Sequence, residues 1–146
     1  TIKAQGDTDV GWHHLVEDVG LVLGRAMREC VGDGAGIVRM ASAYAPLDEA
    51  LARTVVDFSG RGYSVLELRL GDSDLGGLPA DLVRHFLESF AREGGFNLHL
   101  TVLAGENNHH KAEAAFKSLA KAIRAALTID ERQGGRVPST KGTISG

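Results

Sequence analysis

Two short arrays of ionisable residues recur in this sequence with the same residue types at the same spacing. Each array has two adjacent histidines and a glutamate four residues after the first histidine: His13, His14 and Glu17, then His109, His110 and Glu113. Residues four apart share one face of a helix. The first histidine of each pair is therefore expected to point with the glutamate, while the second histidine points in another direction.

Imidazole and carboxylate groups suit a borderline divalent ion such as manganese, iron or zinc. The economical arrangement uses two ions, each bound by the His/Glu pair of one helix and by the remaining histidine of the other helix. Cys30, the single cysteine, lies outside both arrays, which argues against a structural zinc site of the cysteine type. Two other interpretations stay open: a metal-free acid/base site, and histidines that are simply exposed or hydrogen-bonded in place.

The arrays lie within longer segments that match each other. Residues 2–31 and 98–127 align without a gap, which predicts an internal duplication. The predicted division is 1–31 as the remainder of a first half-domain, 32–128 as the second half-domain and 129–146 as a C-terminal tail. A complete first unit would then need about 60 further residues before Thr1. The alternative is a pair of unrelated amphipathic helices.

A second candidate site combines positive charges with a hydroxyl group. Its members are Arg39, Arg61, Ser139 and Lys141, the last three in turn-like or glycine-flanked segments. Guanidinium groups that donate two hydrogen bonds, an ammonium group and a hydroxyl group together are typical of a phosphate-binding pocket. The alternative is that these side chains are merely solvated.

The elements that must position these groups are predicted from the hydrophobic pattern. Apolar residues at three- and four-residue steps predict helices, and alternation of apolar and polar residues predicts strands. The predicted helices span residues 13–31, 80–93 and 109–127, and the predicted strands span 2–6, 37–44, 50–58, 63–70 and 96–103. Pro46 is expected to interrupt the second strand, and residues 48–53 could also form a helix.

The composition excludes several classes of protein. The chain has 146 residues, 43% of them hydrophobic, and a formal net charge of −3, which fits one globular domain and excludes a disordered chain. No apolar run approaches the roughly 20 residues of a membrane span, and the near-neutral charge argues against binding to nucleic acid. With one cysteine and no signal peptide, we expect a cytoplasmic protein.

Five motifs stand in this order along the chain. They are His13-His14-Leu15-Val16-Glu17-Asp18-Val19-Gly20, Leu47-Asp48-Glu49-Ala50-Leu51-Ala52-Arg53, Ser59-Gly60-Arg61, Gly105-Glu106-Asn107-Asn108-His109-His110 and Pro138-Ser139-Thr140-Lys141-Gly142. Together they resemble the imidazoleglycerol-phosphate dehydratases of histidine biosynthesis. The resemblance covers essentially the whole chain.

The resemblance implies an α+β fold of two duplicated sheet-and-helix half-domains, each in two layers (ribosomal protein S5 domain 2-like), with the first half incomplete. It also implies a homo-oligomeric shell of 24 subunits, active sites at subunit interfaces and two Mn²⁺ ions per site. The implied metal ligands are His13, His14, Glu17, His85, His109, His110 and Glu113, of which Glu17 and Glu113 are also candidate catalytic carboxylates. The implied ligands of the substrate phosphate are Arg39, Arg61, Ser139 and Lys141.

The implied reaction is the dehydration of D-erythro-imidazoleglycerol phosphate to imidazole acetol phosphate. The hydrogen removed is not acidic, since no carbonyl group flanks it, so the imidazole ring of the substrate must accept electron density with the help of the metal. The phosphate pocket would add binding energy remote from the reacting carbons. A dinuclear metallohydrolase and a metal-storage or sensing protein are alternatives, but neither explains the Pro-Ser-Thr-Lys-Gly tail.

Overall fold

A computed structural model describes residues 1–144. Its helices are α1 (His13–Val31), α2 (Asp81–Gly94) and α3 (Asn108–Ala126), and its strands are β1 (Met40–Leu47), β2 (Ala50–Asp57), β3 (Tyr63–Glu67) and β4 (Asn97–Ala104). Two single turns of 3-10 helix cover Thr8–Val10 and Glu131–Gln133. The combination of three helices with one four-stranded sheet confirms the predicted α+β class.

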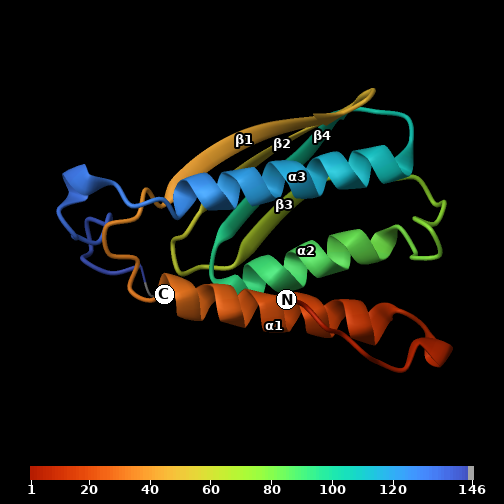
Figure 1. Ribbon diagram of the computed structural model, residues 1–146, viewed down its shortest axis with the longest axis horizontal. Helices are drawn as coiled ribbons and strands as arrows, with labels where there is room; N and C mark the ends of the chain where they lie inside the picture. Colours follow the sequence, from red (N-terminus) through yellow and green to blue (C-terminus); the bar gives the residue numbers. More distant parts are fainter. Residues whose placement is uncertain (145–146) are drawn as a thin grey trace.

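The four strands form one sheet in the order β1-β2-β4-β3. β2 pairs antiparallel with both β1 and β4, whereas β3 and β4 are parallel. The parallel pair needs a crossover connection, and α2 supplies it. In Figure 1 the helices lie on one side of the sheet, where α3 packs on β1 and β2 and α2 packs on β3.

The core lies between this sheet and the helices α2 and α3. Phe96 and alternate residues of β4, Leu98 and Leu100, are fully buried. α3 presents small residues to the sheet, among them Ala115 and Ala122, both with no exposed surface. Small side chains let the α3 backbone approach the strands closely, and that approach determines where the first turn of α3 lies.

α1 packs against α2 through two buried glycines, Gly20 and Gly24. A Cβ atom added at Gly24 would lie 2.7 Å from the Phe90 carbonyl oxygen and 2.8 Å from Glu93 Cβ. The two helices therefore touch at distances that only glycine permits. An ion pair between Arg25 and Glu93, with 3.0 Å between nitrogen and oxygen, joins them at the same level.

We predict that Gly24→Ala destabilises the protein by about 1–3 kcal/mol, the usual cost of an overpacked contact. The added methyl group must push α1 away from α2, and the histidines that these helices bring together would separate. Chemical denaturation gives the stability, and metal titration reports on the histidines.

Gly71→Ala is the matched control for this variant. A Cβ atom at Gly71 would meet its nearest neighbour, an Asn108 side-chain atom, at an ordinary 3.6 Å. Equal stability of the two variants would contradict this prediction, because it would show that the α1–α2 contact has room for a methyl group.

Several predicted elements differ from the observed ones. The predicted strand at residues 2–6 is wrong: this segment is exposed and irregular, since it hydrogen-bonds to neither edge of the sheet, and it lines a groove along α1 instead. The strand predicted at 37–44 is observed at Met40–Leu47 and includes Pro46. β1 is an edge strand, where a residue without an N–H group is tolerated. Residues 50–53 belong to β2 and not to a helix.

No helix within residues 1–144 combines the length and the apolar character that a membrane span requires.

Candidate functional site

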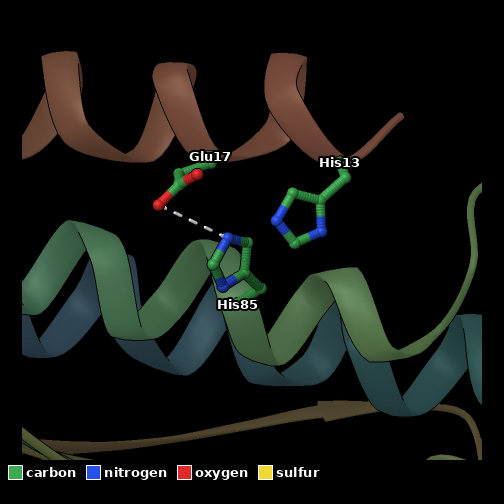
Figure 2. Close-up of side chains that lie close together, drawn as sticks. All are labelled: His13, Glu17 and His85. Atoms are coloured by element: carbon green, nitrogen blue, oxygen red, sulfur yellow. Dashed lines mark ion pairs between the residues drawn. The ribbon is translucent and has the colours of Figure 1, made fainter. Parts of the chain in front are cut away.

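Three predicted metal ligands come together between α1 and α2. His13 and Glu17 lie four residues apart on α1, and His85 faces them from α2 (Figure 2). One potential ligand atom from each side chain lies within 4.8 Å of the other two. Residues 1–144 contain no other group of three histidine, cysteine or acidic side chains that meets this criterion.

The geometry of this cluster suits a metal ion. The imidazole rings of His13 and His85 stack with 4.4 Å between their centres, and Glu17 Oε1 lies 3.6 Å from His85 Nε2. That nitrogen is buried and has no hydrogen-bond partner among the described residues. Ligand atoms held by an ion with bonds near 2.1 Å lie up to about 4 Å apart. The 3.6 Å between Glu17 and His85 is within this range, and the 4.8 Å that bounds all three ligand atoms exceeds it only slightly, so small side-chain movements would let the three groups bind one divalent cation.

The second array lies on the first turns of α3. Asn107 caps this helix by accepting hydrogen bonds from the backbone N–H groups of His109 and His110, which places both imidazoles at the helix start. His109 Nε2 lies 3.2 Å from Glu113 Oε2, as the four-residue spacing predicts. Lys117 Nζ lies 2.8 Å from the other oxygen of Glu113, and its hydrogen bond is the main reason that the pKa of this carboxyl is lowered.

His110 has a partner that the sequence analysis did not assign to the site. Its Nδ1 atom lies 2.7 Å from Glu49 Oε2, in the turn between β1 and β2. The hydrogen bond with His110, together with backbone N–H donors, lowers the pKa of Glu49 to about 2, and the same hydrogen bond raises the pKa of His110. Glu49 stood within the Leu47-Asp48-Glu49 motif, but nothing in its spacing connected it with a histidine 61 residues away.

His14 stands apart from the other predicted ligands. Its side chain is largely exposed, and its Nδ1 atom lies 3.7 Å from Asp7. Within one chain, α1 packs on α2, so His13 and Glu17 meet His85 and not a histidine of α3. The first turns of all three helices nevertheless lie at one end of the molecule, on the right in Figure 1.

The four predicted phosphate ligands line a single cleft of about 790 Å³. They are Arg39, Arg61, Ser139 and Lys141. Arg136 adds a further positive charge, and the hydroxyl group of Ser59 is buried beside them without a hydrogen-bond partner in residues 1–144. Neither residue was predicted as part of this site from the sequence, although Ser59 directly precedes the Gly60-Arg61 turn.

Arg39 lines this cleft with its side chain held in place by hydrogen bonds. Its guanidinium group donates to both carboxylate oxygens of Asp57, at 2.7 and 3.2 Å, and to the Pro138 carbonyl oxygen at 2.7 Å. The last contact ties the tail to the start of β1. Arg61 and Lys141 are exposed, so their charged groups are available to an anion.

The cleft and the histidines lie at opposite ends of the molecule. The tail and the start of β1 are on the left in Figure 1, whereas the helices begin on the right. α1, with 19 residues, runs between the two ends, and a helix of that length spans about 28 Å. A small phosphorylated substrate cannot reach both groups of residues in the same chain.

Comparison with known proteins gives a consistent result. The family of imidazoleglycerol-phosphate dehydratases matches residues 1–123. The chain is 56% identical over 143 residues to the imidazoleglycerol-phosphate dehydratase of Dehalococcoides mccartyi strain CBDB1, which covers 98% of this chain and 71% of the relative. For the enzyme of Rhodopseudomonas palustris the identity is 47%, over 100% of this chain and 74% of the relative.

Solved structures agree with the sequence relatives. The crystal structure of imidazoleglycerol-phosphate dehydratase from Staphylococcus aureus matches with a TM-score of 0.81 and 37% identity, over 88% of this chain and 72% of that chain. The enzyme from Pyrococcus furiosus matches with a TM-score of 0.77 and 39% identity, over 90% and 70% of the two chains.

Proposed function

Because this chain belongs to the imidazoleglycerol-phosphate dehydratase family, we propose that it removes water from D-erythro-imidazoleglycerol phosphate and yields imidazole acetol phosphate. The hydroxyl group leaves the carbon attached to the ring, and a hydrogen leaves the next carbon. The resulting enol then rearranges to the ketone. The cluster of His13, Glu17 and His85 is the single observation that carries this proposal, since the reaction needs a Lewis acid.

We assign the metal ligands to the two histidine arrays and His85, with two Mn²⁺ ions per site. When bound, the ions would stabilise the imidazolate form of the substrate ring, and the electron density of that ring would help to expel the hydroxyl group. His13, Glu17 and His85 already lie together, and His109 lies beside Glu113. Glu17 and Glu113, the two carboxylates of the arrays, remain the candidate catalytic groups.

The cleft at the other end of the molecule would hold the substrate phosphate. Arg61 and Lys141 supply exposed positive charges, and Ser139 supplies a hydroxyl group. Arg39 is oriented by Asp57 before any ligand arrives, which lowers the entropy lost on binding. Binding energy at the phosphate would orient the reacting carbons, which lie elsewhere on the substrate.

The separation of the two ends supports active sites at subunit interfaces. One chain would contribute the end that bears His13, His85 and His109, called here the histidine end. A neighbouring copy would contribute its phosphate cleft. A closed symmetric assembly presents both surfaces repeatedly, and the 24-subunit shell implied by the family satisfies this requirement. Metal ions bound by several chains would also stabilise the assembly that presents their ligands.

We expect the purified protein, supplied with Mn²⁺, to convert imidazoleglycerol phosphate into imidazole acetol phosphate without releasing inorganic phosphate. A lyase assay beside a phosphate-release assay measures both outcomes. A chelator should abolish the lyase activity, and added Mn²⁺ should restore it. Release of phosphate without the ketone would instead favour a metallohydrolase.

A further inference from the structure

Glu49 connects two segments that are distant in the sequence. It lies in the two-residue turn between β1 and β2, and its carboxylate reaches the loop before α3. Oε1 accepts hydrogen bonds from the backbone N–H groups of Glu106 at 3.1 Å and Asn107 at 2.9 Å. Oε2 lies 2.7 Å from His110 Nδ1. Both oxygens of this carboxylate therefore have defined partners.

These contacts determine which nitrogen of His110 carries the hydrogen. An ionised carboxylate has only acceptor atoms, so His110 Nδ1 must donate to Glu49. In a neutral imidazole the other nitrogen, Nε2, then keeps its lone pair. Nε2 lies 3.8 Å from Asp48 Oδ2, which is too far for a hydrogen bond. Asp48 therefore does not favour the tautomer that carries its hydrogen on Nε2.

We propose that Glu49 is the positioning residue of His110: by holding the hydrogen on Nδ1, it presents Nε2 as the metal-binding nitrogen. This inference rests on the proposed function, in which His110 is a metal ligand. Metal-binding histidines commonly donate their second N–H group to a carboxylate, and loss of that partner typically lowers metal affinity about 10- to 100-fold.

Glu49 has two tasks that one substitution can separate. Oε1 holds the loop before α3, and Oε2 holds the imidazole. In Glu49→Gln only one of these positions can be an oxygen. Two backbone N–H groups favour the oxygen at the Oε1 position, which leaves the amide NH₂ facing His110. The imidazole can adapt by moving its hydrogen to Nε2, and that tautomer cannot bind a metal through Nε2.

We therefore expect Glu49→Gln to lower Mn²⁺ affinity about 10- to 100-fold while the unfolding temperature stays close to that of the wild type. Competition with a fluorescent chelator measures the affinity. Glu106→Gln is the matched control, since it removes one exposed carboxylate from the same loop. This control should bind Mn²⁺ as the wild type does.

A double-mutant cycle with His110→Ala shows how Glu49 acts. If Glu49 acts through His110, Glu49→Gln should have no further effect on Mn²⁺ affinity once His110 is alanine. A full effect in that background would mean that Glu49 acts only through the loop, and wild-type affinity in Glu49→Gln itself would equally overturn the proposal. Absence of Mn²⁺ binding by the wild type would instead contradict the proposed function.

The wild-type protein supplies a test that does not depend on the folding of a variant. In metal-free protein labelled with ¹⁵N-histidine, the imidazole ¹⁵N shifts distinguish the two tautomers at a pH where the ring is neutral. The signal missing from His110→Ala identifies this residue. Protonation at Nδ1 is expected, and protonation at Nε2 would refute the assignment.

Discussion

His85→Ala is expected to remove metal from the histidine end of the protein and to abolish dehydratase activity. His85 is the one ligand that α2 supplies to the cluster, and its buried Nε2 atom has no hydrogen-bond partner among the described residues. Without it, His13 and Glu17 remain as only two ligands on a single helix. We expect metal affinity to fall by more than the roughly 10- to 100-fold that loss of an outer-shell partner costs. Elemental analysis after dialysis and the lyase assay measure the two effects.

His99→Ala provides the matched control for this prediction. His99 lies on β4 between Val55 and Val65, in an exposed position of the sheet. The same substitution there should leave metal content unchanged. If His85→Ala kept the full metal content of the wild type, the cluster between α1 and α2 would not be a metal site.

Lys141→Ala is expected to weaken substrate binding without changing the metal content. A charge-assisted hydrogen bond contributes about 1.5–3 kcal/mol, and loss of that amount corresponds to a roughly 10- to 100-fold rise in KM. Lys141 lines the cleft at the opposite end from the histidines, so its loss should not reach the metal ligands. Steady-state kinetics and inhibition by inorganic phosphate measure the effect, and the variant should be much less sensitive to phosphate.

Two controls make this experiment specific. Lys121→Ala removes an equal charge from an exposed position of α3 and should leave KM unchanged. Lys141→Ala alters the phosphate cleft, and His85→Ala alters the metal ligands. Activity should recover when the two variants are assembled together, because some interfaces then combine an intact cleft with intact metal ligands. Unchanged KM in Lys141→Ala would contradict the assignment of the cleft, and failure of the mixture would contradict active sites at interfaces.

Much of the fold and part of the candidate site could be predicted from the sequence. The helix predicted at residues 13–31 is observed with those bounds, since glycines follow a long run of three- and four-residue apolar steps. The pairing of His109 with Glu113 follows from the same periodicity within one helix. The four candidate phosphate ligands, however, were grouped by their chemistry and by the family resemblance, and only the structure shows that they line one cleft.

The sequence by itself determined which side chains share one face of one helix, because helical periodicity is a local property. It did not determine which element packs against that face. The contact of His85 with His13 and Glu17 depends on the close approach of α1 to α2, which Gly20 and Gly24 allow. The bond between Glu49 and His110 depends on where a strand turn meets α3.

The separation of the histidine cluster from the candidate phosphate cleft was likewise decided by the tertiary structure. Each group of residues can be recognised in the sequence by its residue types. In the structure, α1 runs from the histidine end toward the end that bears the phosphate cleft. Contacts between residues far apart in the chain are set by packing of the whole core, which no local pattern encodes. The residue types therefore indicate the chemistry of each candidate group, while the packing of the helices places the two groups at opposite ends of the chain.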